Sequence, residues 1–282
     1  MTGGLSTYRA TSIGAPLLLA LVLGGCSGGS SLTDGGGSGQ GGARPACVPV
    51  SCAGIGNALP CGDCLDNDGD GLADMDDPQC TGPCDTSEES FSVPELPGGN
   101  SSACSNDCLF DADVGMGNDG CQWASQCDPL EVAPRYDPQG PVCAQSPTVA
   151  CATFATQSDG CRSTCLPAVP NGCDCFGCCE LPARGGNFVW LNSKQGDTFS
   201  CATAADLADP AKCRPCTPVA TCLNACDGCE LCIGEIALPS GCQGPACAQN
   251  IQPCGVPGLP RCTGGTACIS GCCQNAPWFS TP

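Results

Sequence analysis

The sequence predicts a small disulfide-rich fold, made mostly of irregular loops with short β-hairpins, little helix and no large hydrophobic core. The first observation is the cysteine content, 33 of 282 residues, which is typical of chains cross-linked in an oxidising compartment. The second is that aromatic residues make up only 4% of the chain, so little large apolar surface is available for burial. The third is the abundance of turn-forming residues, with 40 glycines and 26 prolines. Cross-links must therefore supply much of the stability.

The first residues of the chain are organised like a signal peptide. Arg9 precedes an apolar run from Ile13 to Leu23, which is too short for a membrane-spanning helix but typical of a signal-peptide core. The run leads into Leu23-Gly24-Gly25-Cys26, which resembles the lipobox of bacterial lipoproteins. This resemblance implies a signal peptide over residues 1–25 and cleavage before Cys26. It further implies that lipid such as palmitate on Cys26 anchors the protein in a membrane, with the outer membrane or cell surface as the expected location.

The mature chain divides by composition into three segments. Residues 26–46 are rich in glycine and serine and are predicted to form a flexible tether. Residues 47–84 hold six cysteines around one acidic loop, and residues 85–282 form a longer disulfide-rich domain. Within the longer domain, Thr164-Cys165-Leu166 is echoed by Thr221-Cys222-Leu223, so this domain consists either of diverged repeats or of cysteine-rich sequence that matches itself by chance.

The cysteines favour complete pairing. With Cys26 assigned to lipid, 32 cysteines remain, an even number, as a fully disulfide-bonded exported protein requires. The cluster Cys173-Asp-Cys175-Phe-Gly-Cys178-Cys179 nevertheless has the neighbouring cysteines that a metal–thiolate site needs. Further pairs with C-x-x-C spacing are Cys61/Cys64, Cys213/Cys216 and Cys229/Cys232. Disulfides are the preferred interpretation because exported thiols are oxidised, and extracellular binding of zinc or copper is the alternative.

Charge and the absence of histidine exclude several function classes. The formal net charge of −19 disfavours binding to nucleic acid, whose phosphate backbone repels such a protein. The chain has no histidine, so mechanisms that need an imidazole base or metal ligand are excluded. A histidine-free carboxylate enzyme such as a glycosidase stays open, although no pair among 28 acidic residues stands out.

One acidic loop has the spacing of a calcium site. Counting Asp66 as position 1 of a twelve-residue loop places aspartates at positions 3, 5, 9 and 12 and a glycine at position 6. This pattern resembles the calcium loops of EF-hands, dockerins and thrombospondin type 3 repeats. The resemblance implies calcium ligands at these positions and at the position 7 carbonyl, namely Asp66, Asp68, Asp70, Leu72, Asp74 and Asp77.

The loop departs from the EF-hand pattern at its end. Position 12 is Asp77 and not a bidentate glutamate, and Pro78 follows where a helix would begin. We therefore expect a weak site, with a dissociation constant on the order of 10⁻⁴–10⁻³ M. The alternative is a solvated acidic turn held between disulfides.

Two further features are predicted in the longer domain. Residues 187–191 and 197–201 are β-prone and are expected to pair as a hairpin, with Phe188 and Trp190 on one face that covers the disulfide core. Four oxygen-bearing residues, Asp111, Asp113, Asn118 and Asp119, form either a second cation site or, more simply, a polar turn.

In style the whole chain resembles cysteine-rich, DNDGDG-bearing surface lipoproteins of myxobacteria. This resemblance implies location and disulfides rather than an activity. We therefore expect a non-enzymatic, lipid-anchored surface protein with a structural, adhesive or binding role and a weak calcium site. Its expected partners are the membrane and an extracellular protein or polysaccharide.

Overall fold

Disulfides set the architecture of the part of the chain that the computed structural model describes. This part comprises residues 46–52, 56–91, 101–102, 105–111, 119–130, 151, 155–195, 198–256, 258–263, 265–275 and 279–280. It contains fifteen disulfides, which use every cysteine except Cys26, Cys104 and Cys143. These three cysteines lie outside the described residues. The predicted disulfide-rich fold is confirmed.

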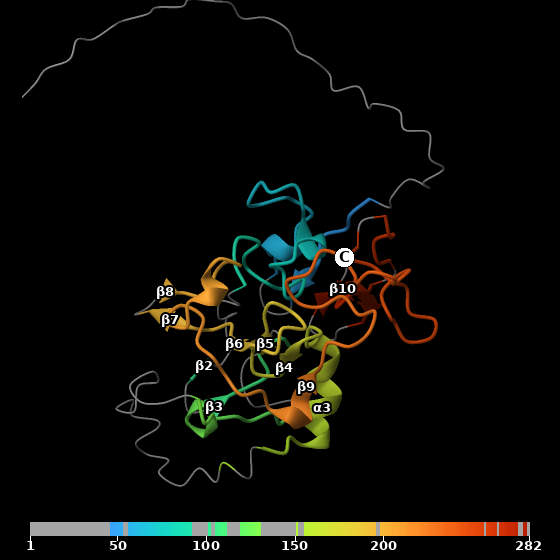
Figure 1. Ribbon diagram of the computed structural model, residues 1–282. Helices are drawn as coiled ribbons and strands as arrows, with labels where there is room; N and C mark the ends of the chain where they lie inside the picture. Colours follow the sequence, from blue (N-terminus) through green and yellow to red (C-terminus); the bar gives the residue numbers. More distant parts are fainter. Residues whose placement is uncertain are drawn as a thin grey trace, which may run out of the picture. The chain divides into compact units, whose positions relative to one another are not determined.

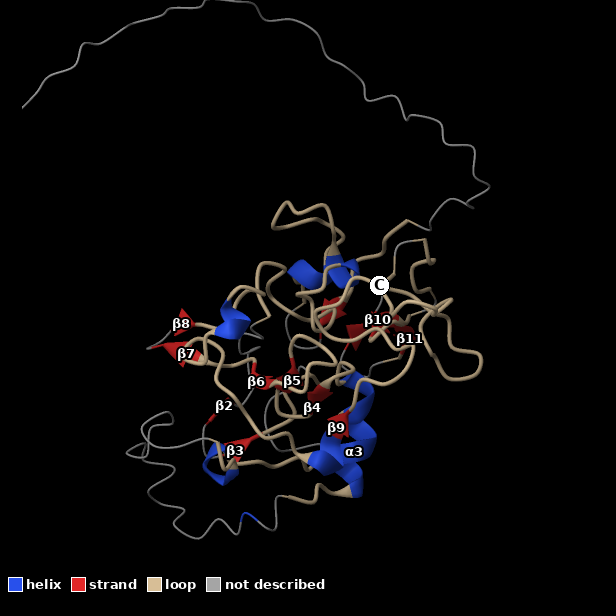
Figure 2. Cartoon of the chain, viewed as in Figure 1, coloured by secondary structure: helices blue, strands red, loops and turns tan. Residues whose placement is uncertain are grey.

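Regular secondary structure is sparse, and loops dominate the picture (Figure 2). Among the described residues the α-helix with assigned bounds is α3 (Asp159–Thr164), capped by Ser158, whose side chain accepts a hydrogen bond from the Cys161 N–H. Single 3₁₀ turns are η1 (Pro60–Gly62), η2 (Asp74–Asp76), η3 (Ser125–Cys127), η4 (Leu166–Ala168), η5 (Asp206–Ala208) and η6 (Ala220–Cys222). No helix among the described residues is both long and apolar enough to cross a membrane.

The strands are two or three residues long and pair antiparallel (Figure 1). The longest sheet has the order β6-β5-β4-β9 and is built from Phe188–Trp190, Cys178–Glu180, Cys173–Asp174 and Leu223–Asn224. Four pairs complete the set: β1 (Ser51–Cys52) with β12 (Phe279–Ser280), β2 (Ser101–Ser102) with β3 (Ser105–Asn106), β7 (Lys194–Gln195) with β8 (Thr198–Phe199), and β10 (Ala267–Ile269) with β11 (Cys272–Gln274).

The predicted pairing of residues 187–191 with 197–201 is wrong. Strand β6 pairs with β5, and β7 and β8 form a separate tight hairpin. Phe188 and Trp190 share one face of β6 and are partly buried, whereas Val189, on the other face, is buried. Trp190 lies opposite Cys178 in the sheet and lines a small hollow with the Cys178–Cys216 disulfide. The guanidinium of Arg214 covers the Trp190 ring at 5.3 Å from its centroid.

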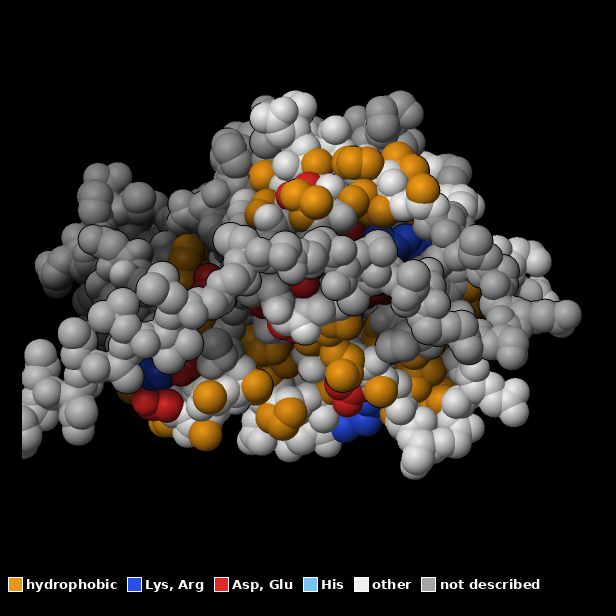
Figure 3. All heavy atoms as spheres, turned by 90° about the horizontal axis from the view of Figure 1, so that it is seen from above, with side chains coloured by type: hydrophobic (Ala, Val, Ile, Leu, Met, Phe, Trp, Pro, Cys, Tyr) orange, Lys and Arg blue, Asp and Glu red, His pale blue; other side chains and the backbone are white. Residues whose placement is uncertain are grey.

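The core is small, and cysteine side chains make up more than half of its main cluster. Ten of the eighteen buried residues in the main cluster are cysteines, packed with a few aliphatic and aromatic side chains such as Leu181 and Phe176. Seen from above, hydrophobic side chains also reach the surface in several patches, among few basic groups (Figure 3). Sulfur bridges thus occupy the place that aliphatic packing fills in an ordinary domain.

Residues 47–84 close three disulfides among themselves: Cys47–Cys64, Cys52–Cys84 and Cys61–Cys80. They also contact the C-terminal region, since β1 pairs with β12 and Arg261 forms ion pairs with Asp74 and Asp76 at 3.3 and 3.7 Å. The acidic loop therefore belongs to a segment that three disulfides hold together.

Alkylation of the purified mature protein provides a first test. Without reduction we expect no thiol to react, because every described cysteine is paired, and after complete reduction we expect 32 added groups on a protein that begins at Cys26. Intact mass measures both values, and several reactive thiols in the unreduced protein would contradict the pairing.

Candidate metal centre

The acidic loop folds back on itself through backbone contacts of its own carboxylates. Asp66 accepts hydrogen bonds from the N–H groups of Gly69 and Gly71 at 2.7 and 3.0 Å. Gly71, at position 6, has a φ of +97° with open space where a Cβ would be, so the glycine is required by backbone conformation and not by crowding. Asp68 and Asp70 each accept from the N–H group two residues ahead, that of Asp70 and of Leu72, at 3.0 and 2.8 Å.

Three of the predicted ligands come together. Carboxylate oxygens of Asp66, Asp68 and Asp70 lie within 4.8 Å of one another, and all three residues are exposed. Three like charges at such separation repel one another, and a divalent cation would remove this repulsion. The triad is therefore able to hold a metal ion.

Asp77, at position 12, is buried and is not one of the three carboxylates that come together. It is only 2% exposed, and its Oδ1 accepts from the Gln79 N–H at 2.8 Å, whereas its Oδ2 has no hydrogen-bond partner among the described residues. Burial raises the pKa of Asp77 to about 6, against the opposing effect of the Gln79 N–H. The negative charges of Asp70 and Asp68 add to the rise, which puts these carboxylates within electrostatic range of Asp77. A buried carboxylate oxygen without a partner is costly, and a bound cation would satisfy it.

Asp74, at position 9, is held away from the triad by other partners. Its Oδ1 accepts from the Cys64 N–H at 2.8 Å and its Oδ2 pairs with Arg261 at 3.3 Å. Burial raises the pKa of Asp74, although the Cys64 N–H and Arg261 oppose this rise. Asp74 therefore ties the loop to Cys64 and Arg261. Leu72 is partly buried, and its backbone N–H donates a hydrogen bond to the Asp70 carboxylate.

Glu88 binds two separate positions of the loop and is not part of the sequence motif. Its side chain is 1% exposed, with Oε2 accepting from the Asn67 N–H at 2.6 Å and Oε1 from the Asp74 N–H at 2.5 Å. Burial raises the pKa of Glu88, although these two N–H groups lower it. One buried carboxylate thus joins the second and ninth positions of the loop. Sequence reasoning misses Glu88 because it lies eleven residues beyond the last loop position.

The second set of oxygen-bearing residues is only partly described. Asp111 and Asp119 are both 2% exposed, whereas Asp113 and Asn118 lie outside the described residues. Asp119 accepts from the Cys121 N–H at 2.8 Å and lies against the Cys108–Cys165 disulfide. The described part supports a buried turn rather than an open cation site.

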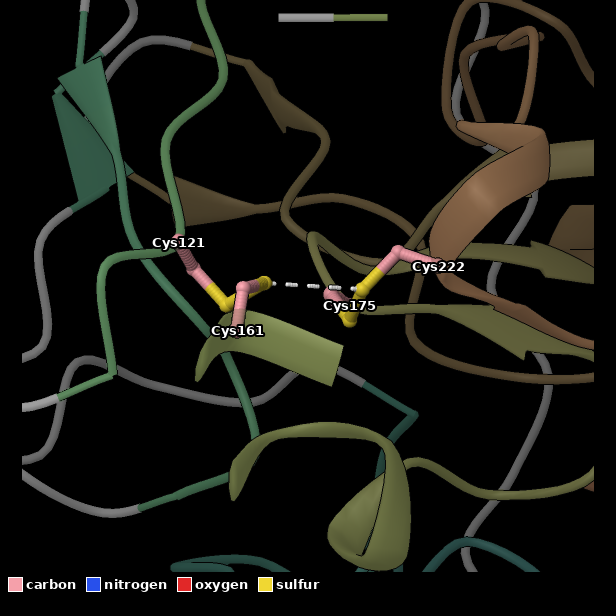
Figure 4. Close-up of side chains that lie close together, drawn as sticks. All are labelled: Cys121, Cys161, Cys175 and Cys222. Atoms are coloured by element: carbon pink, nitrogen blue, oxygen red, sulfur yellow. Dashed lines mark hydrogen bonds between the residues drawn. A yellow bond between two sulfur atoms is a disulfide. The ribbon is translucent and has the colours of Figure 1, made fainter. Parts of the chain in front are cut away.

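The C-x-x-C pairs are bonded elsewhere. Cys61 and Cys64 bond to Cys80 and Cys47, and the other two pairs are likewise split between different partners: Cys213–Cys201, Cys216–Cys178, Cys229–Cys242 and Cys232–Cys226. The closest packing of four sulfur atoms is shown in Figure 4, where Cys161 and Cys222 approach to 3.7 Å. These atoms belong to two disulfides, Cys121–Cys161 and Cys175–Cys222, and disulfide sulfur is not a thiolate ligand.

We found no protein-family model, no curated protein and no solved structure that matches this chain. Function must therefore be argued from the site itself. The proposed lipidation site, Cys26, lies outside the described residues.

Proposed function

We propose that this chain is an exported, non-enzymatic binding protein, anchored by lipid on Cys26, whose loop 66–77 binds calcium. The observation that carries the calcium site is the convergence of the three exposed carboxylates of Asp66, Asp68 and Asp70. The buried Asp77, whose Oδ2 has no hydrogen-bond partner among the described residues, lies within electrostatic range of Asp68 and Asp70 and is the further ligand that we propose. Oxygen ligands of this kind suit a hard cation, and their flexible spacing suits calcium better than magnesium, which demands octahedral geometry.

The disulfides support an extracellular place for this role. Fifteen disulfides among the described residues fit an oxidising compartment, and the lipobox resemblance accounts for attachment to a membrane. A cross-linked module on a glycine-rich tether can present a rigid surface for structural or adhesive contact. Its partner is an extracellular protein or polysaccharide, because a net charge of −19 disfavours nucleic acid.

The two alternatives receive less support. Thiolate capture of zinc or copper needs free thiols, and within the described residues every cysteine with C-x-x-C spacing is bonded in a disulfide. A carboxylate glycosidase needs two carboxyl groups on opposite sides of a substrate cleft. The acids that converge in the described part are those of the loop, which lie together on one turn.

Calorimetry with calcium-free, disulfide-intact protein tests the proposal. We expect one calcium ion to bind with a dissociation constant on the order of 10⁻⁴–10⁻³ M and magnesium to bind more weakly. Asp68→Ala removes one member of the triad and is expected to weaken calcium binding about tenfold or more, whereas Asp227→Ala, at an exposed position outside the loop, leaves it unchanged. Absence of calcium binding up to several millimolar would refute the calcium site.

A further inference from the structure

A cleft in the C-terminal region has neutral polar side chains at nine of its fifteen lining residues. It has a volume of about 640 Å³ and lies between the β10–β11 hairpin and residues 246–252. This volume is in the range of small-molecule sites, roughly 300–1,000 Å³. Six carboxamide side chains line the cleft: Asn171, Asn224, Asn250, Gln252, Gln274 and Asn275.

The walls and floor of this cleft are rigid. Disulfides Cys247–Cys272 and Cys262–Cys273 join its sides. On the floor, the Asn171 amide donates to the carbonyl groups of Leu231 and Ser270 at 3.1 and 3.3 Å and accepts from Asn224 at 2.9 Å. A preorganised site loses little conformational entropy when it binds a ligand.

Other amides of the cleft are available for a ligand. The side chains of Asn250 and Gln274 make no hydrogen bond to any described residue, and the hydroxyl-bearing Thr263 is exposed beside them. A carboxamide both donates and accepts hydrogen bonds, as a sugar hydroxyl does. Ile251, 38% exposed on the same lining, offers an apolar contact for the C–H face of a sugar ring.

The lining argues against other ligand classes. No lysine or arginine is among the described residues that line the cleft, so an anionic ligand would meet only the negative field of the protein. Glu230 is the one acidic residue among them, and its Oε2 accepts from the Asp227 N–H at 2.9 Å, so a cationic ligand has a single carboxylate to pair with. An apolar ligand would leave the amides without hydrogen bonds.

A peptide strand also lacks a place to pair. Strand β11 has β10 on one side and residues 252–254 on the other. There the Cys273 N–H donates to the backbone carbonyl of Gln252 at 2.9 Å, and the Cys254 N–H donates to the backbone carbonyl of Gly271 at 2.8 Å. Both edges of β11 are therefore occupied, and addition of a strand is blocked there.

We propose that this cleft binds a neutral oligosaccharide. The proposal builds on the binding role argued above and names its partner class, a neutral extracellular polysaccharide, but it does not depend on the calcium loop. Titrations run in parallel in EDTA and in calcium separate the two: sugar binding in EDTA supports the cleft whatever the loop does.

The test is calorimetry of the mature, disulfide-intact protein with cellohexaose, maltohexaose and N-acetylchitohexaose, and with an acidic oligogalacturonate as comparator. We expect at least one neutral hexasaccharide to bind and the double variant Asn250→Gly/Gln274→Ala to weaken that binding about tenfold or more. Glycine is chosen at position 250 because Asn250 has a φ of +69°, which alanine adopts only with strain. Gln249→Ala, an exposed amide in the same segment but outside the lining, is the matched control and should bind like wild type.

Three results would overturn the proposal. They are the absence of binding of every neutral probe up to about 10 mM, tighter binding of the acidic comparator, and unchanged affinity in the double variant. Because both replaced side chains make no hydrogen bond to the described residues, the variants are expected to fold, and an unchanged midpoint of thermal unfolding together with an unchanged count of disulfides verifies this.

Discussion

Asp174→Ala is expected to lower the free energy of unfolding by about 3–5 kcal/mol. The Asp174 side chain is 1% exposed, and it accepts three backbone N–H groups, those of Phe176, Cys178 and Val219, at 2.9, 2.9 and 2.8 Å. Alanine would leave all three donors buried without partners. Denaturation by guanidinium with the disulfides intact measures the loss, and Asp227→Ala is the exposed control. A change below about 1 kcal/mol would show that these donors find other partners.

The same residue gives stability a pH dependence. Burial raises the pKa of Asp174 to about 6, although its N–H donors oppose this, so the folded state holds the proton more tightly than the unfolded state. The stabilisation from this proton is complete below the ordinary aspartate pKa of 3.8 and is lost as the pH rises through about 6. It amounts to about 2–3 kcal/mol. Asp174→Asn cannot titrate, so the difference in unfolding free energy between wild type and this variant should shift over that pH interval. A constant difference would contradict the assignment.

Glu88→Ala is expected to weaken both the fold around the loop and calcium binding. Its carboxylate accepts the N–H groups of Asn67 and Asp74, and both donors lose their partner in the variant. We expect a loss of about 2–4 kcal/mol in unfolding free energy and a calcium affinity at least about tenfold lower, because the second and ninth positions of the loop are no longer joined. Denaturation and calorimetry measure the two effects.

The neighbouring residue offers the control for Glu88. Glu89 is exposed and carries the same charge, so Glu89→Ala reproduces the change in net charge and keeps the two hydrogen bonds of Glu88 to the loop. If both variants lower calcium affinity equally, long-range charge explains the lower affinity, and the hydrogen bonds of Glu88 to the loop do not.

The fold class follows from composition, but the disulfide pattern does not. Cysteine density and scarce aromatics predict a cross-linked fold with a small core, yet no local spacing shows that Cys173 pairs with Cys179 while Cys175 pairs with Cys222. The same limit explains the wrong hairpin. Residues 188–190 are β-prone, but they pair with β5, a cysteine-containing strand that also pairs with β4. This pairing depends on the tertiary fold and not on the local sequence.

In the acidic loop, too, the sequence predicts some contacts and not others. Spacing alone predicts that Asp66, Asp68 and Asp70 converge, because these residues share one turn. Spacing cannot predict that Asp74 pairs with Arg261, which lies 187 residues further along the chain, or that Glu88 clamps the loop from outside the motif. Both contacts depend on tertiary packing, which a local pattern does not contain.

A crystal structure of the mature protein grown with calcium tests the central claim most directly. We predict one calcium ion in the loop, identified by its anomalous scattering, with carboxylate oxygens of Asp66, Asp68, Asp70 and Asp77 as ligands at roughly 2.3–2.6 Å. Glu88 should keep its two backbone contacts, and Asp74 should stay on Cys64 and Arg261. A loop that carries no ion at millimolar calcium, with all its disulfides intact, would contradict the account.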